Sequence, residues 1–177
     1  MDDDLRIIQR VLDGDVDAFR QLVERYQAML LTLIGNLVRD RNEREDIAQD
    51  TLLSAYVHLR SFDPRAGKFS TWLLTIARNK CLNRLKKRTP QPMEPLPQRT
   101  DRRDAADALS DTEFFVQLDR ALDTLPVDQR MAFVLAEIQG LSHEQIGRIE
   151  GTPVGTIKSR ISRAKARLRS LLSNTPE

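Results

Sequence analysis

The sequence predicts an all-α protein with two small helical domains, the second containing a helix-turn-helix, joined by a flexible proline-rich linker. Three observations predict this fold class. Apolar residues recur at spacings of three and four in both halves of the chain, without strand-length alternation. Four prolines, at positions 90, 92, 95 and 97, separate the two helical regions. A capped helix, a tight turn and a further helix follow towards the C-terminus.

Composition excludes several classes of protein. The chain has 177 residues, 28 Lys and Arg against 26 Asp and Glu, two His and one Cys. One cysteine cannot form an intrachain disulfide, and with two distant histidines it cannot build an ordinary zinc site. No stretch approaches the roughly 18 apolar residues of a membrane span, and Met1 is followed by aspartates rather than a signal peptide. We therefore expect a cytoplasmic protein that uses no cofactor and no metal.

The first predicted domain covers residues 1–88. Apolar positions mark one helix between residues 18 and 33 and another between residues 47 and 59. Asp63-Pro64 then interrupts the pattern, and Gly67 keeps a short loop open before a third helix begins at Phe69.

Charge is strongly segregated along the chain, although the net charge is only +2. Residues 1–88 carry a net charge of +3, the predicted linker 89–111 carries −2, and residues 112–150 carry −4. Residues 151–177 carry +5, and six basic residues and no acid lie between Arg78 and Arg88. Two basic blocks, each ending a helical segment, indicate two contacts with a polyanion.

The second predicted domain, residues 112–177, has the clearest local signals. Ser142 and Gln145 form a capping box, and Leu141 and Ile146 can pack as a hydrophobic staple around it, so we expect a helix to begin at His143. That helix ends near Glu150-Gly151. Thr152 as N-cap and Pro153 at the first helical position then begin the last helix.

The last helix has one apolar stripe, expected to face the core, and an opposite polar face. The stripe consists of Val154, Ile157, Ile161, Ala164, Leu168 and Leu171. Opposite it lie Lys158, Ser159, Ser162 and Arg163, which suit contacts with base edges in a major groove. The flanking Thr156, Arg160, Lys165, Arg167 and Arg169 suit phosphates. A solvated amphipathic helix would show the same charge, but the preceding capped helix and turn favour a recognition helix.

The helix from Phe69 to Arg88 has two stripes. Leu74, Ala77, Cys81 and Leu85 form the expected core stripe, with Cys81 as a small buried hydrophobe. The other stripe begins aromatic and becomes amide-rich and cationic; it contains Trp72, Ile76, Asn79, Lys80, Asn83, Arg84 and Lys87. Stacking on a ring, pairing with an amide and cationic contacts with phosphate suit opened DNA. Alternatively, Trp72 and Ile76 extend the core and the remainder is solvated.

The sequence resembles the extracytoplasmic-function group of bacterial sigma factors. "EDIAQDTLLSAY" at 45–56 resembles the family's polymerase-binding segment, and "FDPRAGKFSTWLLTIARNKCLNRLKKR" at 62–88 resembles its promoter-melting segment. "LPVDQRMAFVLAEIQGLSHEQIGRIEGTPVGTIKSRISRAKARL" at 125–168 resembles its second DNA-binding domain. The three motifs occur in the family's order, with a linker where the family has one.

The resemblance implies three sets of site residues. Polymerase binding, to the clamp coiled coil of the largest subunit, would use Asp46, Gln49, Asp50 and Leu53, which could otherwise be a solvated acidic helix face. Single-stranded DNA of the minus-ten element would contact Phe62, Arg65, Lys68, Trp72, Asn79, Lys80, Asn83, Arg84 and Lys87. Duplex DNA of the minus-thirty-five element would contact Thr156, Lys158, Ser159, Arg160, Ser162, Arg163 and Arg167.

The resemblance also implies a function and partners: a non-enzymatic sigma subunit that binds core RNA polymerase and promoter DNA, under control of an anti-sigma factor. The alternative is a helix-turn-helix regulator that does not bind polymerase as a sigma subunit. A nucleic-acid enzyme is disfavoured, because the sequence has no glycine-rich phosphate loop and no carboxylate cluster in its basic regions for Mg²⁺. We expect no small-molecule substrate and no catalytic residue.

Overall fold

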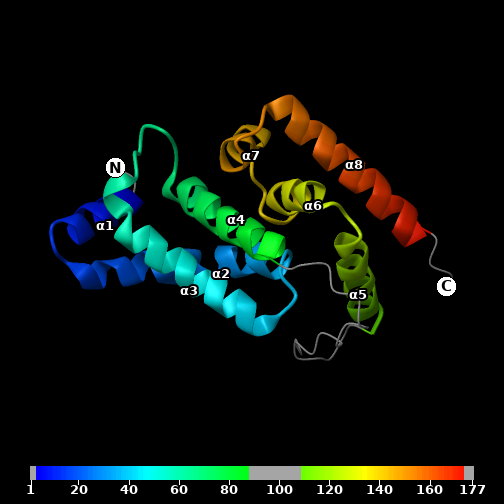
Figure 1. Cartoon of the computed structure of the whole chain (residues 1–177), viewed down its shortest axis with the longest axis horizontal. Helices are drawn as coiled ribbons and strands as arrows, with labels where there is room; N and C mark the ends of the chain where they lie inside the picture. The colour runs from blue at the N-terminus through cyan, green and yellow to red at the C-terminus, as the bar shows by residue number, and fades with distance from the viewer. Residues whose placement is uncertain (1–2, 88–108, 174–177) are drawn as a thin grey trace.

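The structure is a computed structural model that describes residues 3–87 and 109–173. Every regular element within these ranges is helical, so the predicted all-α fold class is confirmed. The N-terminal unit consists of α1 (Asp3–Leu12), η1 (Val16–Ala18), α2 (Phe19–Gly35), α3 (Arg41–Val57), η2 (Leu59–Ser61) and α4 (Phe69–Lys87). The C-terminal unit consists of α5 (Leu109–Asp123), α6 (Val127–Phe133), the π-helical turn η3 (Val134–Ile138), α7 (His143–Glu150) and α8 (Val154–Ser173). Figure 1 shows the two units side by side.

In the N-terminal unit, α2, α3 and α4 pack against one another. Leu30 and Leu33 of α2 and Leu74 of α4 are completely buried between them. Asp40 starts α3 as its N-cap, because its side chain accepts the backbone N–H of Glu43 at 2.9 Å. The third predicted helix begins at Phe69 as expected.

In the C-terminal unit, the capping box at the start of α7 is confirmed. The backbone of Gln145 donates to Ser142 Oγ at 3.2 Å, and the backbone of Ser142 donates to Gln145 Oε1 at 2.9 Å. Gly151 ends α7 with φ of 60°, a left-handed conformation that glycine adopts without strain. The predicted N-cap role of Thr152 is wrong: its hydroxyl donates to the carbonyl of Glu150 at 3.1 Å, and α8 begins at Val154.

The apolar stripe of α8 packs into the core over most of its length. Ile157, Ile161, Ala164 and Leu168 are buried. Leu171 departs from this prediction, since it is 41% exposed, whereas the next residue, Leu172, packs on the core. The stripe therefore packs as predicted through Leu168, and Leu172 instead of Leu171 continues the packing near the end of the helix.

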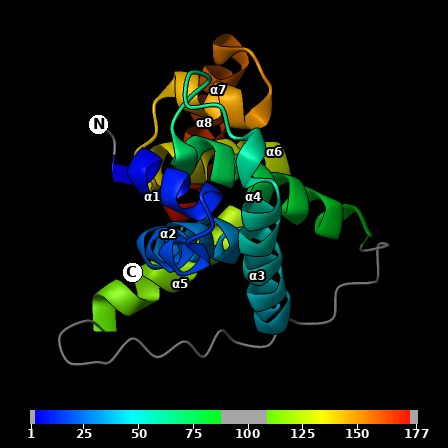
Figure 2. The ribbon, with the colours of Figure 1, turned by 90° about the vertical axis from the view of Figure 1, so that its left-hand side faces the viewer.

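The two units share one buried apolar cluster. It runs from Leu74 and Cys81 of α4 to Ile146 and Ile149 of α7, and α4 packs directly against α7. Figure 2 shows α7 against α4 on the side away from α2. A smaller cluster lies within the C-terminal unit alone: Ala121, Leu122, Leu125, Ala164 and Leu168.

The predicted linker, residues 89–111, lies outside the described residues except for its last three positions. Those positions belong to the first turn of α5, which begins at Leu109.

Candidate nucleic-acid interface

Helix α4 has three sides, which face the N-terminal core, the C-terminal unit and solvent. Leu74, Ala77 and Cys81 are buried against the N-terminal core. Arg78 and Leu82 line a hollow shared with the C-terminal unit. A third side remains open to solvent and presents Asn79, Asn83, Lys86 and Lys87. Because four residues correspond to about 400° of helical rotation, Asn79 and Asn83 lie almost above one another, with Trp72 and Ile76 further along the same side.

Some basic residues at the edge of this open side are buried in part or already paired, which limits their contact with a ligand. Arg84 forms an ion pair with Glu43 of α3, with its Nε 3.2 Å from Oε1. Lys80 is half-buried, whereas Lys87 at the end of the helix is exposed. The predicted single-strand residues of α4 therefore share a surface, but Arg84 is already engaged in holding α3 against α4.

Trp72 belongs to an aromatic cluster at the start of α4. Its ring centroid is 5.6 Å from those of Phe62 and Phe69, and Phe62 and Phe69 are also 5.6 Å apart, edge to face. Phe69 is buried, while Phe62 and Trp72 are half-buried. Part of the Trp72 ring therefore packs in the core and part faces solvent, which leaves stacking on an unpaired base as a prediction.

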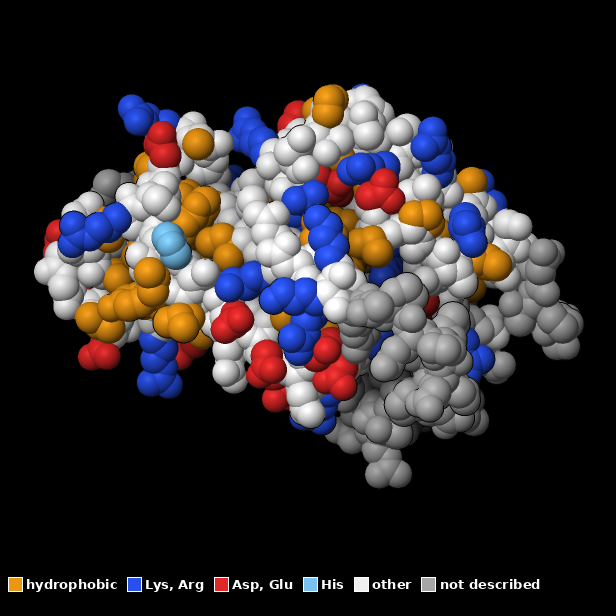
Figure 3. Space-filling view, in the orientation of Figure 1, with side chains coloured by type: hydrophobic (Ala, Val, Ile, Leu, Met, Phe, Trp, Pro, Cys, Tyr) orange, Lys and Arg blue, Asp and Glu red, His pale blue; other side chains and the backbone are white. Residues whose placement is uncertain are grey.

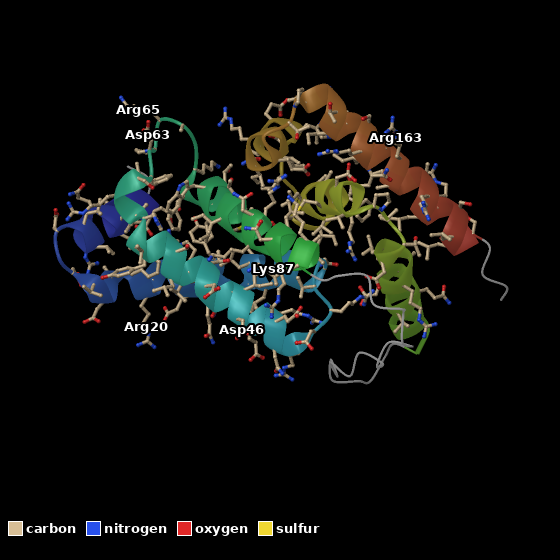
Figure 4. All side chains as sticks on the ribbon, viewed as in Figure 1. Arg20, Asp46, Asp63, Arg65, Lys87 and Arg163 are labelled. Atoms are coloured by element: carbon tan, nitrogen blue, oxygen red, sulfur yellow. The ribbon has the colours of Figure 1, made fainter. Side chains whose placement is uncertain are left out.

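The loop between η2 and α4, residues 62–68, is held by a local ion pair. Asp63 accepts the backbone N–H of Arg65 at 2.9 Å and pairs with its guanidinium, which keeps the pKa of the Asp63 carboxyl below its ordinary value. Figure 4 shows the two side chains at the tip of this loop. The side chain of Arg65 is 90% exposed and Lys68 is also exposed, so the loop presents two cations beside the aromatic cluster.

The acidic residues of α3 lie on an exposed helix face. Asp46, Gln49, Asp50 and Leu53 are all exposed, and their spacing of three and four places them on one side. Figure 4 shows Asp46 on the outer side of α3.

Sequence reasoning missed the apolar extension of this face. Leu53 is 61% exposed, Val57 is 64% exposed, and Tyr56 is also exposed beside Phe19, with ring centroids 5.2 Å apart. Leu31 of the neighbouring α2 is exposed as well. Figure 3 shows apolar side chains gathered on this part of the molecule. Val57 lies four residues after Leu53, a spacing that is visible in the sequence, but of the exposed apolar residues only Leu53 was predicted as a site residue.

On α8, the predicted base-reading residues share the solvent-facing side. Lys158, Ser162 and Arg163 are exposed, and Ser159 is half-buried with its hydroxyl donating to the carbonyl of Thr156 at 2.8 Å. Thr156 and Arg167 are exposed, and Figure 4 shows Arg163 projecting away from the molecule. A hollow of about 340 Å³ adjoins this face, lined by His143, Lys158, Ile161, Ser162, Lys165, Ala166 and Arg169.

Arg160 does not lie with the other predicted phosphate contacts. It forms ion pairs with Glu150 and, at 3.1 Å, with Asp128, and its side chain is 22% exposed. Three residues of helix place Arg160 only about 60° from the core residue Ile157, so it points towards α6 and α7. Its neighbour Glu150 is buried, and this burial raises the pKa of the Glu150 carboxyl despite the opposing charge of Arg160.

Cys81 is completely buried, and burial raises the pKa of its thiol to about 12. Within residues 3–87 and 109–173, no three His, Cys, Asp or Glu side chains lie together as a metal site. No helix in the same ranges is long and apolar enough to cross a membrane.

Two helical units, one ending in a helix-turn-helix with a basic outer face and the other with an aromatic-to-basic helix, define a two-part DNA-binding protein. Residues 22–91 match the model of Sigma-70 region 2, and residues 115–168 match that of Sigma-70, region 4. Among relatives, the ECF RNA polymerase sigma factor SigM of Mycobacterium tuberculosis is 37% identical, over 96% of this chain and 84% of SigM. The ECF RNA polymerase sigma factor SigW of Bacillus subtilis is 35% identical, over 93% of this chain and 94% of SigW. The chain therefore belongs to the extracytoplasmic-function (ECF) sigma factors of RNA polymerase, and the resemblance is confirmed.

Two solved structures have a similar fold across both units. The sigma factor RpoE of Bartonella quintana, in complex with the anti-sigma factor NepR, has a TM-score of 0.69 at 29% identity and covers 89% of this chain and 98% of RpoE. CnrH, in complex with the cytosolic domain of CnrY, has a TM-score of 0.74 at 25% identity and covers 96% of this chain and 97% of CnrH.

Proposed function

We propose that this sigma factor directs core RNA polymerase to specific promoters through three separate surfaces and catalyses no reaction itself. The observation that carries the proposal is the separation of two basic faces, on α4 and on α8, from an acidic and apolar face on α3. A helix-turn-helix regulator would need only the face on α8.

The face of α3 is the proposed contact with the clamp coiled coil of the largest polymerase subunit. Exposed Leu53, Tyr56 and Val57 supply apolar area beside the charged Asp46 and Asp50. Interface energy usually concentrates in a few apolar or aromatic anchors surrounded by polar residues. We therefore assign the anchor role to Leu53, Tyr56 and Val57, and an orienting role to the acids.

The open side of α4 and the loop before it are the proposed contact with the opened minus-ten strand. Phe62 and Trp72 can stack with an unpaired base, and Asn79 and Asn83 can pair with base edges. Lys87, Arg65 and Lys68 are exposed cations suited to the phosphates. Lys80 and Arg84 contribute at the margin, because one is half-buried and the other is paired with Glu43.

The outer face of α8 is the proposed contact with the minus-thirty-five duplex. Lys158 and Arg163 can donate to guanine acceptors, and Ser159 and Ser162 are short enough to allow close approach. Thr156 and Arg167 suit phosphates. Arg160 is left out of this surface, since its guanidinium is committed to Glu150 and Asp128.

Control by an anti-sigma factor is part of the proposal, because the similar RpoE of Bartonella quintana was solved with one. We propose that the partner covers the polymerase-binding face and that the protein acts in the cytoplasm, at the nucleoid when it is active. No small-molecule substrate or cofactor is required for these roles.

The experiment that tests this function mixes the purified chain with bacterial core RNA polymerase and sequences the transcripts made from fragmented genomic DNA of its source. We expect discrete start sites that share a two-part upstream motif. A Val57→Asp variant should lose these transcripts, whereas Arg20→Asp, a change at an exposed position of α2, should keep them. Binding to duplex DNA without polymerase, and no specific transcripts with it, would favour an ordinary regulator instead.

A further inference from the structure

Helix α1 lies outside the residues that match Sigma-70 region 2, because that match begins at residue 22. Its apolar face is buried, since Ile7, Ile8 and Val11 all belong to the larger cluster. This apolar packing does not explain Asp4, a carboxylate on the same helix that is only 6% exposed. Burying a charged group is costly unless it is paired and hydrogen-bonded, so the partners of Asp4 indicate what it does.

Two side chains of α2 hold the Asp4 carboxylate. The guanidinium of Arg25 donates to its Oδ1, and the hydroxyl of Tyr26 donates to its Oδ2. Arg25 also pairs with Asp3, so α1 is tied to α2 without the hydroxyl. A hydrogen bond to an ionised acceptor is stronger than one between neutral groups. The bond from the Tyr26 hydroxyl therefore restrains the position of the Tyr26 ring.

The Tyr26 ring packs on the aromatic cluster at the start of α4. Its centroid is 5.5 Å from that of Phe69, with an angle of 52° between the two planes. Phe69 is 2% exposed, and its centroid is 5.6 Å from those of Phe62 and Trp72. Phe62 and Trp72 are half-buried, so they are the rings of this cluster that a base can reach. A continuous row of contacts thus joins Asp4 to Trp72 through Tyr26 and Phe69.

Helix α1 supports the same surface at a second point. It packs against η2, the turn that directly precedes Phe62. The backbone of Phe62 donates to the carbonyl of Leu59 in this turn at 3.1 Å, and Leu59 is 2% exposed. Figure 1 shows α1 beside η2. Both half-buried rings are therefore backed by parts of the molecule that α1 contacts.

Stacking on an unpaired base depends on how well the receiving rings are oriented. A binding group keeps its geometry when packing and hydrogen bonds behind it fix its rotamer. Protein interiors are close-packed, so one ring cannot turn without displacing its neighbours. A displaced Tyr26 ring would therefore move Phe69, and through Phe69 it would move Trp72.

We propose that Asp4 of α1 is a positioning residue for base capture: through the Tyr26 hydroxyl and the Phe69 ring, it holds Trp72 in the orientation that stacks with the opened minus-ten strand. The proposal rests on the proposed function. It gives α1 a part in promoter melting without requiring α1 to touch DNA. Because the polymerase-binding face on α3 is a separate surface, loss of Asp4 should impair melting and leave polymerase binding unchanged.

The first test follows the fluorescence of Trp72 in the free full-length chain. Trp72 is the only tryptophan of the sequence, so its signal reports on this cluster directly. Tyr26→Phe removes the hydroxyl and keeps the ring, and Asp4→Ala removes the acceptor. Each variant should increase quenching of Trp72 by acrylamide about twofold, because one hydrogen bond that holds the cluster is lost. The double variant should exceed neither single variant, since both remove the same bond.

The matched control is Asp15→Ala. Asp15 also ties down α1, by pairing with Arg10 in its last turn, but its other partner is the backbone of Ala18 rather than a ring. Quenching should be unchanged in this control, and Asp4→Asn, which keeps an acceptor oxygen, should resemble the unmodified chain. Equal quenching in Asp4→Ala and Asp15→Ala, or none gained in Tyr26→Phe, would overturn the proposal. Urea unfolding of each variant confirms that it remains folded.

The second test measures open-complex formation with core polymerase on a promoter selected in the transcription experiment. Asp4→Ala and Tyr26→Phe should form open complexes about fivefold more slowly than Asp15→Ala, with the same affinity for core polymerase. Equal rates, or a loss of polymerase affinity that accounts for the slower melting, would overturn the positioning role. If even the unmodified chain supports no specific transcription, the proposed function fails, while the fluorescence still decides whether Asp4 holds Trp72 in place.

Discussion

Helices α4 and α8 are both long and basic, yet the structure uses them in opposite ways. Helix α4 has 19 residues and is enclosed by the N-terminal core on one side and by α7 on another. Helix α8 has 20 residues and keeps one whole side exposed. The cations of α4 are partly engaged, as with Arg84 and Glu43, whereas Arg163 and Arg167 of α8 face solvent.

This difference follows from what each helix is proposed to bind. An unpaired base stacks on an aromatic ring, and packing holds that ring in place. The proposed contact on α4 therefore includes side chains, such as Trp72, that also pack in the core. A duplex needs only side chains that project into a groove, so the contact on α8 can lie entirely on the surface. Stability and DNA binding should therefore be coupled in α4 and separable in α8.

The largest expected effect is the loss of stability when a buried leucine is truncated, compared between α4 and α8. Leu74→Ala in α4 should lower the free energy of unfolding by about 4 kcal/mol, because Leu74 is completely buried in the larger cluster. Leu168→Ala in α8 should cost about 2 kcal/mol, since its cluster is small and can relax. Urea unfolding measures both. Leu171→Ala, on the exposed end of α8, is the control and should change stability by less than about 0.5 kcal/mol.

The next prediction separates the two kinds of arginine on α8. Arg160→Ala should cost about 2 kcal/mol of stability, because it removes the ion-pair partner of the buried Glu150. Arg167→Ala should leave stability unchanged. It should reduce the slope of log K for duplex binding against log salt concentration by about one.

Removing the buried charge provides the control for Arg160. The double variant Arg160→Ala with Glu150→Gln should recover part of the lost stability, since no unpaired carboxylate remains. If Arg160→Ala instead reduced the salt slope while leaving urea unfolding unchanged, Arg160 would contact phosphate as the sequence suggested.

The ion pairs of Arg160 could not be predicted from the sequence. The sequence predicted the helical fold class, the capping box at Ser142 and the burial of Cys81, because each depends on short-range spacing. It placed Arg160 among the phosphate contacts because neither Glu150 nor Asp128 is a neighbour at helical spacing. Ion pairs formed through tertiary packing leave no local pattern.

The exposed apolar residues of α3 were missed for a related reason. Periodicity identifies a helix but not which of its faces is covered, so the spacing did not show that Tyr56 and Val57 are exposed. The contact between the two units was likewise hidden, because Gln139 and Arg148 bind backbone carbonyls, and every residue provides one. These features became visible only when the packing was known.

A smaller effect distinguishes the two DNA contacts directly. Asn79→Ala should reduce open-complex formation about tenfold and leave binding of the upstream duplex unchanged. Arg163→Ala should weaken upstream duplex binding about tenfold and alter melting only through that loss. Permanganate footprints report melting, and gel shifts with upstream-fork DNA report duplex binding. If both variants lost the same step, either melting or duplex binding, the assignment of melting to α4 and duplex binding to α8 would be wrong.

The smallest predicted effect concerns the cap that orients the helix-turn-helix. Ser142→Ala removes the acceptor for the backbone of Gln145 and should cost about 1 kcal/mol. Because α7 packs against α8, a frayed α7 should loosen the contact of α8 with the duplex. We therefore expect slightly weaker upstream binding in Ser142→Ala. Ser142→Asn, which keeps a capping oxygen, should resemble the unmodified protein, and unchanged upstream binding in Ser142→Ala would mean that the first turn of α7 does not orient α8.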